Sequence, residues 1–230
     1  MTKKQKGAII GALAVLILAA FAIWGVTSRA SNRYTELGAL YGESQKLEDK
    51  RSGDKADFIV GKHFAISKSE FENMVSQNEV SGLNRADAEQ MAYCQFIISR
   101  AIYGQAIDDG YLVDAAVVDS QINEDRAVMS EGDGREAFLS YLEGAGMTEA
   151  EYWDSMRDTY QRTMTIAQYV DAIKDRFLKE FGSDAEKWDE YCFSATQEMI
   201  EKQDVSCKDP TAWTLRRDNY NATGIWPTMP

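Results

Sequence analysis

The chain has 230 residues, 44% of them hydrophobic, and carries 37 acidic against 25 basic residues, a net charge of −12. It is long enough to bury a core, and its negative charge repels phosphate backbones, which argues against nucleic acid as a partner. With one histidine, three cysteines and no Cys-X-X-Cys pair, it lacks the spacing of a zinc site.

Residues 7–27 are predicted to form a single transmembrane anchor. No charged residue or proline interrupts residues 7–26, and a helix of that length matches a hydrocarbon core of ~30 Å. Lysines precede this segment, whereas the first acidic residue is Glu36. The positive-inside rule therefore keeps residues 1–6 in the cytoplasm and places the rest outside the cell membrane. A cleaved signal peptide, with Ser28-Arg29-Ala30 at the cleavage region, is the alternative.

Residues 28–55 are polar and are predicted to form a stalk or linker that includes a short helix marked by Leu37 and Leu40. The β-prone residues 58–66 follow, broken by Gly61, and predict at most one short strand or hairpin.

Residues 56–207 are predicted to form a helical domain. Ser67–Glu70, Thr148–Glu151 and Ser183–Glu186 each have the form of a capping box, in which a serine or threonine and a glutamate cap a helix start. Apolar residues then recur at helical spacing. The predicted helices cover residues 68–78, 85–108, a stretch from 115 to a glycine break at 132–134, a short one around 138–142, 152–177 and 188–200. The fold class is therefore all-α.

The cysteines and the tail leave alternatives open. Cys94 lies in an apolar helical run and is expected to be buried. Cys192 and Cys207 are a candidate disulfide in an oxidising compartment. The C-terminal tail, residues 208–230, contains Trp213 and Trp226, which either pack on the domain or bind a partner.

Three segments carry a resemblance to a known family. They are Ile66-Ser67-Lys68-Ser69-Glu70-Phe71, the helix, glycine turn and helix start in residues 95–114, and the short helix, glycine turn and long helix start in residues 138–153. In order and spacing, residues 56–181 resemble the SurA N-terminal-like chaperone domain of SurA- and PrsA-type foldases. The resemblance implies a helical module that binds unfolded or newly exported polypeptides.

The chain also departs from that family. Foldases of this type carry a parvulin-type prolyl isomerase domain with a histidine pair, but only about fifty residues follow Phe181 and none is histidine. The lipid-anchor cysteine of PrsA-type proteins is absent as well. The resemblance therefore implies a chaperone-like function without prolyl isomerase activity.

No motif predicts catalysis. The carboxylates near Glu149 and Asp184 are typical of helix starts, where they favour the positive end of the helix dipole, and His63, the sole histidine, lies in a predicted turn. We expect no enzyme activity, cofactor or metal.

Two functions compete. In the first, an extracytoplasmic, membrane-anchored protein buries apolar client side chains against aromatic and methionine side chains, for which the candidates are Tyr152, Trp153, Met156 and Tyr160. In the second, a structural or assembly subunit docks on one defined partner in a cell-envelope membrane complex, through Trp213 and Trp226.

Overall fold

The computed structural model describes residues 34–43, 57–131, 134–208, 213, 215, 217, 220 and 223–227. The predicted anchor, residues 7–27, lies outside this part of the chain. Among the residues described, no helix combines the length and the apolar character needed to cross a membrane.

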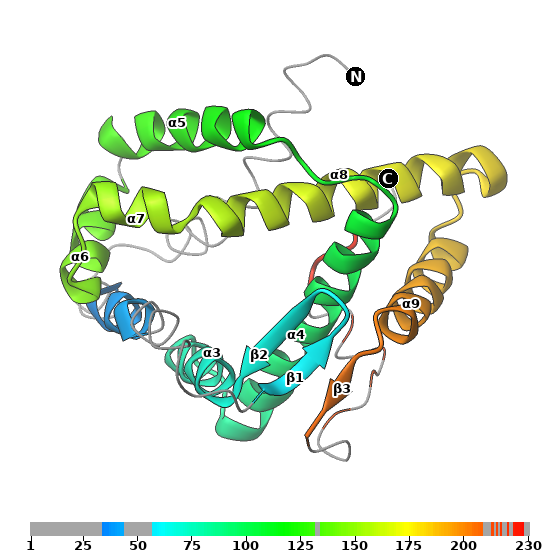
Figure 1. Cartoon of the computed structure of the whole chain (residues 1–230), viewed down its shortest axis with the longest axis horizontal. Helices are drawn as coiled ribbons and strands as arrows, with labels where there is room; N and C mark the ends of the chain where they lie inside the picture. Colours follow the sequence, from blue (N-terminus) through cyan, green and yellow to red (C-terminus); the bar gives the residue numbers. More distant parts are fainter. Residues whose placement is uncertain are drawn as a thin grey trace. The chain divides into compact units, whose positions relative to one another are not determined.

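The described residues are mostly helical and include one small sheet (Figure 1). A helix at residues 34–43 comes first. The elements that follow are β1 (Asp57–Gly61), β2 (Phe64–Ser67), α3 (Lys68–Val80), α4 (Arg85–Asp108), α5 (Ala115–Glu131), α6 (Arg135–Ala145), α7 (Glu149–Ser155), α8 (Arg157–Phe181), α9 (Ala185–Lys202) and β3 (Ser206–Cys207). The predicted helical class is confirmed at this level.

The chain divides into two compact units. The first unit contains Met1–Lys46 and Leu112–Ala167, and the second contains Leu47–Tyr111 and Gln168–Pro230. Helix α8 contributes its first part to one unit and its second part to the other.

The first unit is built around aromatic and aliphatic side chains of α5 to α8. Its buried cluster consists of Val113, Val118, Ile122, Phe138, Leu142, Tyr152, Trp153, Tyr160 and Met164. Burial of such apolar surface is the main source of its stability.

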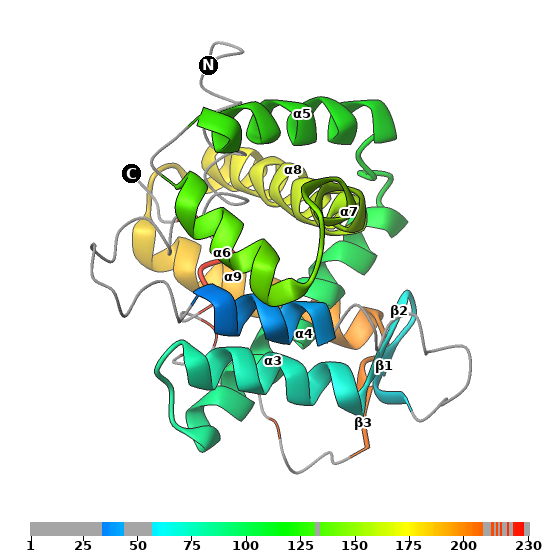
Figure 2. The ribbon, with the colours of Figure 1, turned by 90° about the vertical axis from the view of Figure 1, so that its left-hand side faces the viewer.

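The helix at residues 34–43 belongs to this first unit, although we expected its surroundings to be a stalk. Figures 1 and 2 show it (in blue) beside α6. A Cβ atom added to Gly38 would collide with the Tyr141 carbonyl oxygen, and one added to Gly144 would collide with that of Thr35. The two helices therefore touch backbone to backbone, and Tyr41 adds its ring to the core cluster.

The second unit contains a three-stranded sheet in the order β2-β1-β3. Strands β1 and β2 form an antiparallel hairpin, and β3 pairs antiparallel with the other edge of β1, Ile59 opposite Cys207. The expectation of at most one strand or hairpin is thus wrong by one strand. Strand β3 has only two residues, and so short a run does not predict a strand from the sequence. Its pairing with β1 depends on where the preceding helix α9 ends.

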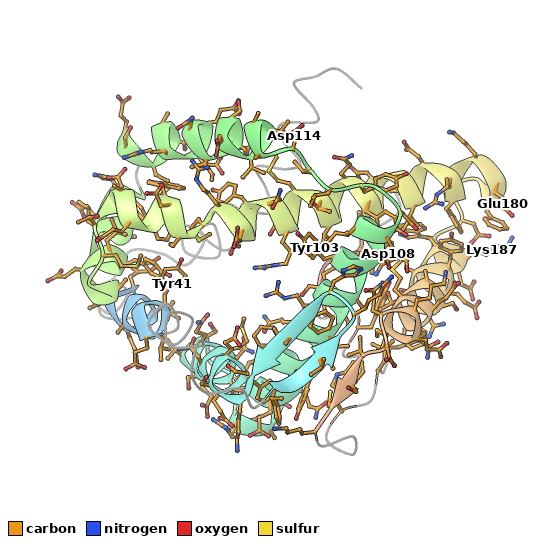
Figure 3. All side chains as sticks on the ribbon, viewed as in Figure 1. Tyr41, Tyr103, Asp108, Asp114, Glu180 and Lys187 are labelled. Atoms are coloured by element: carbon orange, nitrogen blue, oxygen red, sulfur yellow. The ribbon has the colours of Figure 1, made fainter. Side chains whose placement is uncertain are left out.

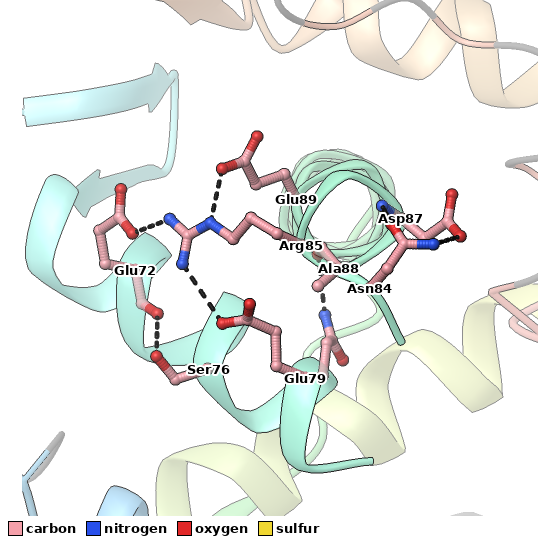
Figure 4. A network of polar contacts seen from close by, with 9 residues as sticks. Glu72, Ser76, Glu79, Asn84, Arg85, Asp87, Ala88 and Glu89 are labelled. Carbon is pink, nitrogen blue, oxygen red and sulfur yellow. Dashed lines mark hydrogen bonds and ion pairs between the residues drawn. The ribbon is translucent and has the colours of Figure 1, made fainter. Parts of the chain in front are cut away.

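Helices α3 and α4 pack on this sheet around Ile59, Ile66, Phe71, Val75, Ala88, Ala92, Tyr93 and Ile97. On the surface, Arg85 of α4 forms ion pairs with Glu72 and Glu79 of α3 and with Glu89 of its own helix (Figure 4). The Glu72 and Glu89 carboxylates raise the pKa of the Arg85 guanidinium further above its ordinary value. The pairs are solvent-exposed, so they orient the two helices more than they stabilise them.

Two of the three predicted capping boxes are confirmed. Ser67 caps α3 and Thr148 caps α7, each with its glutamate bonding back to the cap backbone. The third prediction is wrong. Asp184, not Ser183, caps α9 by accepting from the Lys187 backbone N–H at 3.1 Å. A carboxylate one residue further along competes successfully for this position, as Asp and Ser are equally good caps.

The predicted long helix at 152–177 is divided into α7 and α8 at Met156. The Ser155 hydroxyl donates to the Tyr152 carbonyl at 2.7 Å, and that carbonyl also accepts from the Met156 N–H. A hydroxyl that competes for a helical carbonyl in this way bends a helix. Two glycines end helices in the left-handed conformation, Gly146 after α6 and Gly182 after α8.

Candidate functional site

The four residues predicted to contact clients lie in or against the core of the first unit. Tyr152 and Trp153 are each 3% exposed and Tyr160 is 4% exposed, while Met156 is half-buried. Adjacent residues on a helix point about 100° apart, a geometry that would let one of the first two rings lie at the surface. Both are covered instead, since Phe138 of α6 contacts both rings, with ring centroids 5.1 and 5.8 Å away.

These side chains have structural roles. The Tyr160 hydroxyl donates to Asp125 Oδ2 at 2.6 Å, and burial together with this carboxylate raises the pKa of Tyr160. The Tyr41 hydroxyl lies 2.8 Å from Ser155 Oγ and also donates to Met156 Sδ. The rings of Tyr152, Trp153 and Tyr160 offer no surface to a client while the first unit is folded, which corrects their assignment as client contacts, and Met156 is only partly accessible.

The candidate disulfide is absent from this structure. No disulfide joins Cys94, Cys192 or Cys207 to one another; Cys94 is buried as predicted, and Cys192 is buried as well. Cys192 lies on α9 whereas Cys207 belongs to β3. Burial raises the pKa of the Cys192 thiol to about 12, and a thiol that stays protonated is a poor nucleophile for disulfide formation.

Aromatic side chains gather instead where α8 ends and α9 begins, in the second unit. We call Phe177, Phe181, Trp188 and Tyr191 the α8–α9 aromatic cluster. The Phe177 ring centroid lies 5.0 to 5.4 Å from those of the other three. Phe177 and Trp188 are buried, but Phe181 is 43% and Tyr191 is 37% exposed. The rings of Phe181 and Tyr191 are thus partly exposed to solvent and pack on the buried Phe177 ring.

The C-terminal tail packs on the next turns of α9. Trp226 meets Trp188 edge to face at 5.9 Å and donates from Nε1 to Thr196 Oγ1 at 3.0 Å. Trp188 Nε1 in turn donates to the Pro227 carbonyl at 2.8 Å. The Tyr220 ring contacts Phe193 at 5.5 Å. Of the two tail readings, the one in which the aromatics pack on the domain therefore describes this structure.

Trp213 packs separately, against the core of α3, α4 and the sheet. Its indole therefore also faces the domain, and docking of a partner through Trp213 and Trp226 would require both tail segments to detach first.

A polar cluster surrounds Asp108 at the end of α4 (labelled in Figure 3). Asp108 accepts from Lys62 Nζ at 2.8 Å and from Gln203 Nε2 at 3.0 Å, and it lies 2.8 Å from His63 Nε2. These donors, Lys62 first, hold the pKa of the Asp108 carboxyl well below its usual range. The cluster joins the β1–β2 turn, the end of α4 and the end of α9.

This Asp108 cluster is a structural junction more than a reaction centre. Gln203 is fully buried, and its Oε1 atom faces Gly104 without a hydrogen-bond partner. The carboxylate is already engaged by three donors, which leaves it a weak base. Within the described residues, no three histidine, cysteine, aspartate or glutamate side chains are grouped as metal ligands.

Sequence reasoning missed the exposed rings of the α8–α9 aromatic cluster. The available signal was Phe181, four residues after Phe177 and at the last position before the Gly182 cap. A helix end leaves its last turn with fewer neighbours, so an aromatic residue there is a better candidate for a surface contact than one in mid-helix.

We compared the chain with known proteins. No protein-family model, no curated protein and no solved structure matches it.

Proposed function

We propose that this protein is a membrane-anchored, extracytoplasmic, chaperone-like protein that binds unfolded or newly exported polypeptides and has no prolyl isomerase activity. Three features support the proposal: the basic N-terminus followed by an apolar segment at 7–27, the resemblance of residues 56–181 to SurA N-terminal-like domains, and a largely helical, non-repetitive fold.

The observation that carries the proposal is the exposure of Phe181 and Tyr191 in the α8–α9 aromatic cluster. Large rings that remain half in water offer apolar area to any client side chain, and they lose little conformational entropy on contact. The underlying Phe177 and Trp188 rings are buried and hold this surface in place. Capture of many different clients requires weak binding that tolerates differences in client sequence.

The experiment is suppression of aggregation. The full chain in mild detergent is mixed with a chemically denatured client at near-equal molar amounts while the client is diluted from denaturant. Light scattering should rise more slowly and to a lower plateau than with detergent alone. An unchanged scattering curve would count against the proposal.

A second candidate function is docking of a folded envelope partner, and one observation favours it. On α5, Val117 is 51% and Val128 is 67% exposed, and their separation of eleven residues places them on one side of the helix. A helical face with two exposed apolar side chains held in fixed positions suits a defined surface better than a flexible client. Cross-linking in cells that yields one dominant partner would support this candidate.

A further inference from the structure

The tail residues Arg217, Tyr220, Trp226 and Pro227 lie against α9 as a bound peptide would, and we call them the tail segment. On α9, Trp188, Cys192 and Thr196 follow each other at intervals of four, while Asp189 and Phe193 form the adjacent row. Residues at these intervals share one side of a helix. The tail segment therefore covers one continuous face of α9, which we call the covered face.

The covered face offers a distinct chemistry. The Trp188 indole N–H binds a main-chain carbonyl, and the Thr196 hydroxyl accepts from an indole. Asp189 pairs with the Arg217 guanidinium at 2.6 Å, and that guanidinium also lies 5.1 Å from the centre of the Phe193 ring. The face thus recognises a main-chain carbonyl together with one aromatic and one basic side chain.

Several contacts of the tail are weak. The Tyr220 hydroxyl and the Trp213 indole N–H are buried without a nitrogen or oxygen partner, and they lie beside the thiols of Cys192 and Cys94. Thiols are poor hydrogen-bond acceptors. The Arg217–Asp189 pair is about half exposed, so salt screens it. The tail segment therefore gains less binding free energy from the covered face than a chain whose polar groups all had strong hydrogen-bond partners.

We propose that the tail segment is an internal ligand that occupies a polypeptide-binding face on α9, and that unfolded segments bearing an aromatic and a basic residue bind by displacing it. This inference rests on the proposed function and names its site and its regulation. The aromatic cluster makes the first contact, since Tyr191 lies on α9 itself and Phe181 ends the preceding helix α8. The client segment then binds the covered face.

Cys192 reports whether the tail segment is in place, because Tyr220 covers its thiol. In Trp226→Ala, alkylation of Cys192 followed by peptide mass spectrometry should be faster by about tenfold, as one ring contact and one hydrogen bond no longer oppose local opening. Cys94, which lies under Trp213, is the internal control and should be unchanged. Arg217→Ala, at a half-exposed position, should give a smaller increase at Cys192 alone.

A peptide with the sequence of residues 213–230, added in trans, should return Cys192 of Trp226→Ala to the wild-type labelling rate. The same peptide with Ala in place of Tyr220 and Trp226 should not. Protection by the first peptide alone supports an occupied site. If both variants leave Cys192 unchanged, or if neither peptide protects it, the tail is ordinary core and the inference is overturned.

The last measurement separates the two proposals. Reduced, carboxymethylated lysozyme, a permanently unfolded chain, is titrated against wild type and Trp226→Ala, and the variant should bind severalfold more tightly. Equal binding by both proteins overturns the inference but leaves the proposed function standing. Binding by neither protein, with Cys192 uncovered in the variant, overturns both.

Discussion

At the scale of single residues, Asp108 shows how one carboxylate joins three distant segments. Lys62 and His63 come from the turn between β1 and β2, and Gln203 follows α9. In the sequence, Asp108 is an ordinary helix end and His63 an ordinary turn residue. Their contact spans 45 positions, so only the packing of the second unit brings them together.

The first prediction concerns pH. The folded pKa of Asp108 lies below its unfolded value, so its stabilising effect is complete above the ordinary aspartate pKa of about 3.9 and declines as the pH falls below it. The difference in free energy of unfolding between wild type and Asp108→Asn should therefore shrink between about pH 4 and pH 2. Urea unfolding at several pH values measures it. A difference that does not vary with pH would contradict the assignment.

The second prediction concerns the glycines of the first unit. Gly38→Ala should destabilise the protein by about 1–3 kcal/mol, because its Cβ would meet the Tyr141 backbone. Gly134→Ala is the matched control, since its φ of −80° suits alanine and the nearest heavy atom to its Cβ is 3.8 Å away. Thermal unfolding compares the two. Equal effects would show that the helix at residues 34–43 does not pack on α6 in solution.

At the scale of elements, the correct predictions of helix bounds came from local features of the sequence, namely apolar spacing, flanking residues and glycines. Helix α4 begins and ends where its apolar period and flanking residues indicate, and Gly146 and Gly182 end α6 and α8 as expected. Strand β3 depends on a partner strand that the local sequence does not contain. The interruption at Met156 involves the adjacent Ser155 hydroxyl, which the apolar period does not report. The same limit applied to the client contacts. A stripe of aromatics predicts a buried face but not which helix covers it.

The third prediction uses the helix caps. Ser67→Ala should lower the free energy of unfolding by about 1–2 kcal/mol, because it removes the oxygen that accepts from the Glu70 N–H. Asp184→Ala should cost about 1 kcal/mol at α9. Ser183→Ala, next to the true cap, should change stability by less than about 0.5 kcal/mol. A larger effect at Ser183 than at Asp184, measured by urea unfolding, would reverse our assignment of the cap.

At the scale of the whole molecule, two compact units surround separate cores and the second carries the exposed aromatic rings. The sequence predicted the helical class, yet it placed the candidate contacts on α7 and the start of α8, where they are buried in the first unit. The rings that reach solvent lie at the α8–α9 connection. Exposure depends on how helix ends meet, and periodicity alone does not report it.

The fourth prediction is made at this scale. Replacing both Phe181 and Tyr191 by alanine should reduce suppression of client aggregation severalfold, with little loss of stability because both rings are already partly in water. Val128→Ala, which removes a more exposed apolar side chain from α5, is the control and should suppress aggregation as wild type does. Light scattering at equal protein concentrations compares the three proteins.

The most direct test of polypeptide capture is photo-cross-linking in living cells with benzoylphenylalanine in place of Tyr191. We predict many cross-linked products of different mass, which disappear when protein synthesis is stopped, because newly made exported chains are the ligands. A single product that persists after synthesis stops would contradict the account and identify the protein as a subunit of a defined assembly.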